Sequence, residues 1–455
     1  MKATSHQTSG RSKSIRRLAI ASTFAIVLAA CGDDDEPGGS STPAASDSAS
    51  ADASSEPAPA EPSASESVAT ESVSATEASA SGEADPDAVS ALITKVFQQE
   101  MDSADVHPLI VEALGRATVE LTPEQLDTAY TCWEGSDCTV PGGGDAVLAI
   151  VDSFGGNTWR RISKMETILQ ALTYPEIGRI ISTDANFDLP TYQSQVRGAV
   201  AQGANLLVGY NDFGDAMAPT YKDAQDAGAF VSIYVGPVPT AGADAIVTQI
   251  VTDTCGAGTD MANAAIELTG GSGKVAFFNG TPGNPQGAAW NKCTLDQLAA
   301  EGGGVEKTFD ADTSWTPAGA AEAASALIAT GDPVDAILYD YADPLPGVVD
   351  TYVQAGEKPP ALITWTMNND LFRVWEEAQG TDGAFDLYYT SGLNWVARVS
   401  VTAVVNALNG NPSDAVILYP LPFVPAKAGM YEADKPGDFP GTAIVPAELL
   451  VRMIG

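Results

Sequence analysis

The sequence predicts an α/β protein with two similar lobes, each built on a parallel sheet that helices cover on both faces. The first indication is an alternation of strand-like and helix-like segments that begins near residue 145 and continues to about residue 390. The second is that the strand-like segments are nearly continuous apolar runs, which is typical of strands buried on both faces. The third is that the alternation divides into two stretches, 145–250 and 255–390, which indicates two lobes.

The predicted elements follow one another in a regular order. Apolar runs typical of strands cover residues 146–153, 177–183, 204–211, 230–236, 274–280, 335–341, 361–367 and 385–391. Helical patterns lie between most of them, at residues 191–203, 217–228, 257–268, 286–302, 318–331 and 347–356. Strands that alternate with helices in this way form βαβ units, so the sheets are expected to be parallel.

The N-terminal segment has the features of an export signal. Residues 1–17 contain five basic residues and no acidic one, and the apolar run 18–30 that follows is too short for a spanning helix, which needs about 20 residues. The run ends in Leu-Ala-Ala followed by Cys31, which resembles the bacterial lipobox, where the cysteine is acylated. We therefore interpret residues 1–31 as a lipoprotein signal peptide with Cys31 as the lipidation site, and we expect the protein to be exported and anchored to the outer face of the cell membrane.

Two further segments precede the lobes. Residues 32–86 consist almost entirely of Ala, Ser, Thr, Pro, Gly, Asp and Glu, which cannot bury apolar surface, so we predict a disordered tether. Residues 87–144 are predicted to be a helical N-terminal extension. We assign residues 145–252 to lobe I, completed by about 393–420, and residues 253–392 to lobe II, completed by about 421–455.

The cysteines predict two disulfide bonds. With Cys31 assigned to lipid, four cysteines remain, and an even number outside the reducing cytosol favours pairing. Cys132 with Cys138 would close a short local loop, and Cys255 with Cys293 would join two segments of one lobe. A zinc site is the alternative, but there is no C-x-x-C pair and no nearby histidine.

The composition excludes several classes of function. The chain has a net charge of −37 at pH 7, so its surface repels nucleic acid and anionic lipid headgroups. His107 is the one histidine after the signal segment, which leaves little basis for a Ser-His-Asp or Cys-His mechanism. No acidic motif reproduces a calcium loop. We therefore expect no catalytic residues, no metal and no cofactor.

Aromatic and amide side chains recur where the predicted strands end. In parallel α/β sheets, ligands bind outside the carboxyl ends of the strands. The segment 150–162 runs from a buried strand into Gly-Gly-Asn and then a Trp beside two arginines, which marks either a bulky helix start or the edge of a site. We expect ligand contacts at these strand ends from Asn157, Trp159, Arg160, Tyr210, Tyr234, Tyr341, Asp343, Trp365, Asn368, Ser391 and Asn394.

Two long stretches resemble the type I periplasmic binding proteins. Residues 273–302 are similar to the segment that leads from a strand into the first helix of that family's second lobe, and residues 198–236 are similar to a strand-helix-strand unit of its first lobe. The resemblance covers about residues 145–425. It implies two Rossmann-like lobes joined by a hinge of three strands, with a small solute, most often a sugar, held between them. It also implies an ABC transporter permease and ATPase as partners.

The resemblance also assigns roles to residues. It implies that Asn157 and Trp159 contact the sugar from the first loop. From the second lobe it implies a contact from Trp290 or Asn291 and one from the central aromatic Trp315. Positions after later strands correspond to Tyr341, to residues 366–368 and to Ser391. The chain departs from the family at Tyr234-Val235, where sugar binders often carry Asp-Arg. We therefore expect a site without that charged clamp, with either a ligand less polar than ribose or a greater dependence on stacking.

Three functional hypotheses follow from these features. The first is an exported solute-binding lipoprotein that delivers a sugar-like ligand to an ABC transporter. The second is a ligand-sensing receptor module of the same fold for a membrane signalling partner. The third, less favoured, is a surface glycoside hydrolase, because two suitably placed carboxylates could occur among so many acidic residues.

Overall fold

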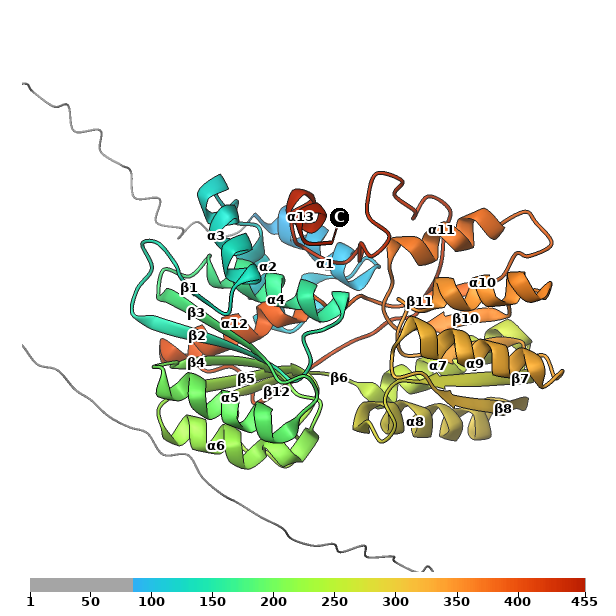
Figure 1. Cartoon of the computed structure of the whole chain (residues 1–455), viewed down its shortest axis with the longest axis horizontal. Helices are drawn as coiled ribbons and strands as arrows, with labels where there is room; N and C mark the ends of the chain where they lie inside the picture. Colours follow the sequence, from blue (N-terminus) through green and yellow to red (C-terminus); the bar gives the residue numbers. More distant parts are fainter. Residues whose placement is uncertain (1–84, 455) are drawn as a thin grey trace, which may run out of the picture. The chain divides into compact units, whose positions relative to one another are not determined.

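The computed structural model of the protein describes residues 85–454. The predicted signal peptide with Cys31 and almost all of the predicted tether lie outside the described residues. The described chain forms two α/β lobes, each with its own sheet (Figure 1). Among its helices, none is long and apolar enough to cross a membrane.

Lobe I contains a seven-stranded sheet that is parallel except at one edge. In spatial order its strands are β1 (Asp137–Thr139), β3 (Ile177–Asp184), β2 (Ala146–Asp152), β4 (Leu206–Tyr210), β5 (Phe230–Val235), β6 (Thr248–Thr252) and β12 (Val416–Tyr419). The helices in contact with the parallel strands of this sheet are α4 (Thr158–Ala171), α5 (Leu189–Ala201), α6 (Ala218–Asp226) and α12 (Val396–Leu408). Helix α3 (Pro123–Glu134) contacts the antiparallel edge strand β1.

Lobe II contains a six-stranded sheet that is again parallel except at one edge. In spatial order its strands are β13 (Val424–Pro425), β11 (Leu387–Tyr389), β10 (Ala361–Thr364), β9 (Ala336–Tyr339), β7 (Ser272–Asn279) and β8 (Gly304–Asp312). The helices of this lobe are α7 (Thr254–Thr269), α8 (Pro285–Glu301), α9 (Pro317–Ala329), α10 (Leu345–Ala355) and α11 (Asn369–Ala378).

The central strands are buried on both faces, as their apolar runs predict. In β7, Phe277 packs in one apolar core with α7 and α8, whereas its neighbour Phe278 packs in a separate core with α9 and α10. Successive side chains of a strand point to opposite faces, so both faces of the sheet must be covered to bury the pair. The eight predicted strands and six predicted helices are confirmed.

Three of the elements that sequence patterns missed, α12, β8 and β12, have an identifiable reason. Helix α12 has eleven buried residues and packs against α4, α2 (Pro108–Ala117) and three strands, so it lacks the polar face that marks a surface helix. Strands β8 and β12 lie at sheet edges and alternate between exposed and more buried residues, unlike the apolar central strands.

The predicted N-terminal extension is partly integrated into lobe I. It comprises α1 (Pro86–Phe97), the short 3-10 helix Ser103–Asp105, α2, and α3 (Pro123–Glu134), and Thr122 caps α3 with Pro123 in its first turn as predicted. The boundary at residue 144 is wrong, because β1 pairs with β3 as the antiparallel edge of the lobe I sheet. Helices α2 and α3 pack on α4 and share its apolar core, so the extension is not a separate domain.

Three connections between neighbouring strands and helices join the lobes, and the segment after β13 adds a fourth crossing. The chain passes between them from β6 to α7, from β11 to α12 and from β12 to β13 (Figure 1). This agrees with the hinge that the family resemblance implies.

The assignment of residues 421–455 to lobe II is wrong for their last part. Residues 426–446, here called the C-terminal strap, first lie on lobe II, where Glu376 of α11 accepts backbone N–H bonds from Gly429, Met430 and Tyr431 at 2.8–3.1 Å. The strap then returns to lobe I, where the Ile444 N–H donates to Glu166 of α4. The final helix α13 (Ala447–Ile454) packs on the extension, with Arg452 paired to Asp127 of α3 at 3.0 Å. The chain therefore crosses between the lobes a fourth time.

Both predicted disulfide bonds are present. Cys132 pairs with Cys138 between α3 and β1, and Cys255 pairs with Cys293 between α7 and α8, at sequence separations of 6 and 38. Because a longer closed loop restricts the unfolded chain more, removing the second bond with Cys255→Ala and Cys293→Ala is expected to cost about 2–4 kcal/mol of unfolding free energy. Removing the first bond should cost less. Urea denaturation of the two double variants tests this order, and equal losses would contradict it.

Candidate functional site

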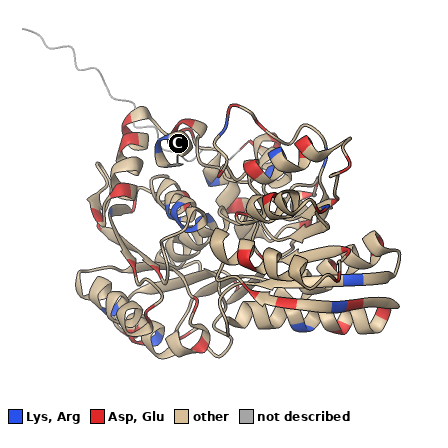
Figure 2. Ribbon diagram, turned by 45° about the vertical axis from the view of Figure 1, so that its right-hand side comes forward, with Lys and Arg blue, Asp and Glu red and all other residues tan. Residues whose placement is uncertain are grey.

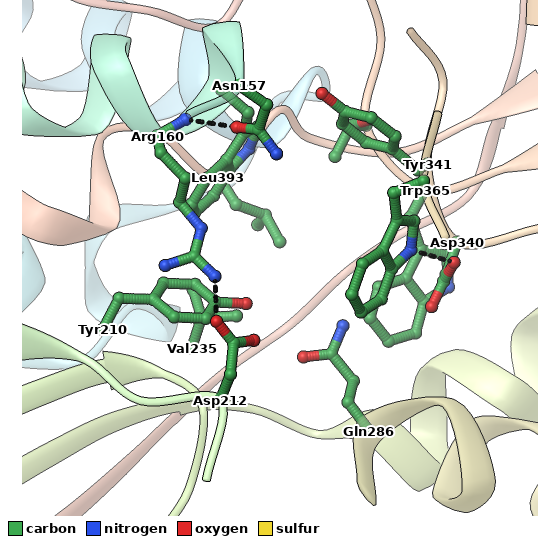
Figure 3. A pocket seen from close by; sticks show the side chains of 13 residues that line it. Asn157, Arg160, Tyr210, Asp212, Val235, Gln286, Asp340, Tyr341, Trp365 and Leu393 are labelled. Carbon is green, nitrogen blue, oxygen red and sulfur yellow. Dashed lines mark hydrogen bonds and ion pairs between the residues drawn. The ribbon is translucent and has the colours of Figure 1, made fainter. Parts of the chain in front are cut away.

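A cavity lies between the two lobes at the carboxyl ends of their strands (Figure 3). Its lining combines aromatic faces, two amides and three ionisable groups. The lining residues are Asn157, Trp159, Arg160, Tyr210, Asp212, Val235, Gln286, Trp315, Asp340, Tyr341, Trp365, Thr366 and Leu393. Seven of these come from the predicted site: Asn157, Trp159, Arg160, Tyr210, Trp315, Tyr341 and Trp365.

The segment 150–162 is both a helix start and the edge of the cavity. Asn157 is the N-cap of α4, and its side-chain oxygen accepts the backbone N–H of Arg160 at 2.8 Å. This leaves the amide NH₂ of Asn157, which points into the cavity in Figure 3, free to donate to a ligand. Trp159, in the first turn of the same helix, donates its indole N–H to the Gly392 carbonyl oxygen at 2.5 Å. That bond links lobe I to a connection between the lobes and holds the ring in place.

Arg160 carries the positive charge of the cavity. Its guanidinium forms ion pairs with Asp152 at 2.6 Å and Asp212 at 2.7 Å and lies 3.1 Å above the centre of the Tyr210 ring. Only 6% of Arg160 is exposed, so neither the cation nor its partners can exchange these contacts for water. The expectation of a site without a charged clamp is therefore wrong. The Asp-Arg dipeptide is missing after β5, but an Arg from α4 and an Asp after β4 supply the same charges.

The lobe II side of the cavity is organised around Asp340. Its two carboxylate oxygens accept indole N–H bonds from Trp315 at 2.8 Å and from Trp290 at 3.2 Å. The Trp315 ring lies directly against Gly280, where a Cβ atom would come within 1.8 Å of the indole. Glycine at 280 is thus required for this ring position. Figure 3 shows Asp340 and Trp365 on the side of the cavity opposite Arg160.

Strained backbone is concentrated at the cavity. Four of its lining residues are not glycine and yet have positive φ angles: Val235 at 64°, Trp315 at 53°, Thr366 at 59° and Leu393 at 62°. For β-branched residues such as Val235 and Thr366 this conformation is a steric outlier. Strain of this kind persists where the surrounding structure holds it, and it occurs preferentially at ligand sites.

Comparisons with known proteins agree with this geometry. A family model described as a periplasmic binding protein domain matches residues 149–412, more than half of the chain. The chain belongs to this family. Its two lobes, three connections and interlobe cavity are those of the type I periplasmic binding protein fold. A search of curated protein sequences found no match.

Solved structures show the same fold. The arabinose-binding component of an ABC transporter from Shewanella sp. ANA-3 has a TM-score of 0.55 at 18% identity, covering 62% of this chain and 92% of that one. A solute-binding protein from Bacillus halodurans C-125 with bound myo-inositol has a TM-score of 0.55 at 14% identity, covering 63% and 96%. A fructose-binding periplasmic domain of a hybrid two-component system has a TM-score of 0.53 at 14% identity, covering 62% and 90%.

The other seven predicted contact residues of this binding protein do not line the cavity. They are Tyr234, Trp290, Asn291, Asp343, Asn368, Ser391 and Asn394. Three of them contact lining residues and hold these in position. Tyr234 packs edge-on against Tyr210, Trp290 donates to Asp340, and Asn394 donates to the Trp159 carbonyl oxygen at 2.9 Å.

The remaining four have other structural partners. Asp343 accepts the Tyr341 hydroxyl at 2.5 Å and the Asn368 amide at 2.9 Å, while the Asn368 oxygen caps α11. Ser391 accepts the indole N–H of Trp395, and Asn291 donates to Asn279 in β7. These residues do not line the cavity in this structure, and a role for them in ligand contact stays a prediction.

Sequence reasoning missed Asp212, Val235, Gln286, Asp340 and Leu393 as lining residues. Asp340 is adjacent to Tyr341 and Asp212 lies two residues after Tyr210, both of which the strand-end pattern did mark, so a wider window at those strand ends would have included them. Among residues 85–454 no group of three or more His, Cys, Asp or Glu side chains could hold a metal ion.

Three buried aspartates make the stability of this binding protein depend on pH. Burial raises the pKa of Asp152 to about 7 and those of Asp340 and Asp343 to about 6. In the unfolded chain these carboxyl groups have pKa values near 4, so the folded state binds the protons more tightly than the unfolded state does. Ionisation of these groups at higher pH therefore lowers the free energy of unfolding. We expect the free energy of unfolding without ligand to rise as the pH falls from 7.5 to 5. Urea titrations at both values test this, and Asp343→Asn should show a smaller rise. A rise of the same size in the Asp343→Asn variant would show that Asp343 does not contribute to the pH dependence of stability.

Proposed function

We propose that this chain is an exported solute-binding protein that captures a small sugar or polyol between its lobes and delivers it to an ABC transporter permease and ATPase. The observation that carries the proposal is the interlobe cavity, which combines indole faces with charged and amide groups. Sugars present apolar ring faces surrounded by hydroxyls, so their binding sites need flat aromatic surface together with groups that donate and accept hydrogen bonds.

The cavity supplies each of these features. Trp159 reaches it from lobe I and Trp315 and Trp365 from lobe II, so aromatic surface is available on both sides. Arg160 and the amide NH₂ of Asn157 can donate to ligand oxygens, and Asp212 can accept from hydroxyls. The bound sugars and polyols named for the similar structures are of this chemical kind.

A thermal-shift screen tests the proposal. Pentoses, hexoses, their amino derivatives and polyols are added one at a time to the purified folded protein. A ligand that binds only the folded state raises its stability by mass action, by about 2.7 kcal/mol at a hundredfold excess over Kd. We expect at least one member to raise the melting temperature. The absence of a shift from every member at millimolar concentration would contradict the proposal.

A sensing role is the second candidate. It is favoured by the similarity to a periplasmic domain of a hybrid two-component system. The two roles differ in what a deletion strain loses. Loss of uptake of the ligand identified in the screen supports delivery to a transporter, whereas unchanged uptake with loss of the transcriptional response to that ligand supports sensing.

We further propose that the protein is a lipoprotein anchored through Cys31. The basis is the Leu-Ala-Ala-Cys sequence after an apolar run. Cys31→Ser is expected to release the protein from the membrane fraction into the soluble fraction, because the acceptor thiol is lost. Cys132→Ser, which removes a cysteine from the folded part, is the matched control and should stay with the membrane. Retention of the Cys31 variant in the membrane fraction would refute the anchor.

A further inference from the structure

We propose that the preferred ligand carries an amino group, and that its ammonium form lies beside Asp340 within the indole-lined side of the cavity. The inference rests on the proposed function, and it narrows the ligand class to amino sugars or amino polyols. It is drawn from the distribution of charge in the cavity, from the surroundings of Asp340 and from the aromatic side chains that lie next to it.

The cavity contains more negative than positive charge. Asp212 and Asp340 line it together with Arg160, and Asp152 lies directly behind Arg160. The single guanidinium is already paired with Asp152 and Asp212. Among residues 85–454, no Lys, Arg or His side chain lies within 4 Å of the Asp340 carboxylate. A neutral ligand would leave that negative charge without a counter-charge.

Asp340 is arranged to remain ionised despite its burial. Only 5% of the residue is exposed, and burial raises the pKa of its carboxyl to about 6. The two indole donors, Trp315 and Trp290, favour the ionised form, because an ionised carboxylate accepts both bonds. At neutral pH the group is therefore a buried carboxylate held in a defined orientation. An ammonium group offsets the cost of such a buried charge, whereas a hydroxyl only donates a hydrogen bond to it.

The aromatic residues near Asp340 also suit a cation. Trp365 and Tyr341 lie on the same side of the cavity as Asp340 (Figure 3), and Trp315, which donates its indole N–H to Asp340, also lines the cavity. A cation over an aromatic face is attracted by the ring, most strongly by an indole, and this attraction increases when water is excluded. Carboxylate and indoles together therefore favour an ammonium group more than either does alone.

The lobe I side of the cavity can bind the hydroxyl groups of the ligand. Arg160, Asp212 and the Asn157 amide supply donors and acceptors for hydroxyl groups, as described above. The excess of acidic residues over both lobes (Figure 2) also favours the approach of a cation over that of an anion. A ligand with hydroxyls at one end and an amine at the other matches both sides.

Matched ligand sets test the inference by calorimetry at pH 7.5. Each set contains a neutral sugar, its 2-amino derivative and the N-acetyl form, for example D-glucose, D-glucosamine and N-acetyl-D-glucosamine, with the galactose and mannose sets in parallel. Acetylation keeps the nitrogen but removes its charge. We expect one free amine to bind at least about tenfold more tightly than both of its neutral relatives.

Two variants test whether Asp340 causes the tighter binding of the amine. Asp340→Asn should abolish the preference for the amine, so that the amine and its parent sugar bind this variant with equal affinity. Asp350→Asn is the matched control, because it removes the same charge from the exposed face of α10 in the same lobe, and it should leave the preference for the amine intact. The comparison within each ligand set uses the unmodified protein, so it holds even if the Asp340 variant fails to fold.

The outcomes separate this inference from the proposed function. A neutral sugar that binds as tightly as its amine would overturn the inference and leave the sugar-binding function standing. A preference for the amine that survives Asp340→Asn in a folded variant would also overturn it. If no member of any set binds but a pentose or polyol of the thermal-shift screen does, the inference is wrong and the proposed function stands. If nothing binds in either experiment, both are wrong.

Discussion

Replacing Arg160 by methionine is expected to lower the free energy of unfolding by about 3–5 kcal/mol, because it leaves two buried carboxylates without their cation. Asp152 and Asp212 each lie within 2.7 Å of the guanidinium, and Arg160 also covers the Tyr210 ring. Methionine keeps much of the volume of the side chain but none of its charge. The loss should shrink at pH 5, where the unpaired carboxyl groups take up protons. Urea denaturation at pH 7.5 and pH 5 measures both effects.

Two controls make this result specific. Arg161→Met changes the neighbouring arginine, which is exposed and forms no ion pair in the described part of the chain, so it should cost less than about 1 kcal/mol. Adding Asp152→Asn to the Arg160 variant should recover part of the lost stability, because one of the unpaired charges is removed. A loss equal to that of Arg161→Met, or no recovery in the double variant, would show that the buried ion pairs are not what stabilises this lobe.

Trp159→Ala and Trp315→Ala are each expected to weaken binding of a sugar identified in the screen by about 2 kcal/mol or more, as the loss of a buried aromatic anchor does. The first substitution removes aromatic surface on lobe I and the second on lobe II. Trp315→Ala also takes one indole donor from Asp340, so its effect should be the larger for an amino ligand. Calorimetry on the folded variants measures both affinities.

Trp133→Ala is the matched control for these two variants. Trp133 lies in α3 of the extension and donates its indole N–H to the Arg161 carbonyl oxygen, outside the interlobe cavity. Its substitution should leave the affinity unchanged although it can lower stability. If the Trp159 and Trp315 variants bind as tightly as the Trp133 variant, the ligand does not occupy the interlobe cavity.

Sequence patterns were sufficient for the two-lobed α/β fold, because the apolar runs of central strands and the polar faces of surface helices are visible along the chain. The same patterns failed where an element is buried on all sides or lies at an edge. Helix α12 shows no polar face, since α4, α2 and three strands surround it. The return of the chain end to lobe I depends on single hydrogen bonds, such as that from the Ile444 N–H to Glu166, and these have no sequence period.

For the candidate site too, some features could be predicted from the sequence and others could not. The sequence by itself determined which strand ends carry aromatic and amide side chains, and Asn157, Trp159, Arg160 and Trp315 do line the cavity. Only the tertiary structure decided which side chains reach the cavity and which support them. Trp290 and Trp315 both donate to Asp340, yet Trp290 is completely buried and only Trp315 borders the cavity, lying against Gly280. The physical reason is that side-chain direction at a strand end depends on backbone angles and on the space left by distant segments, and neither is encoded in the spacing of residue types.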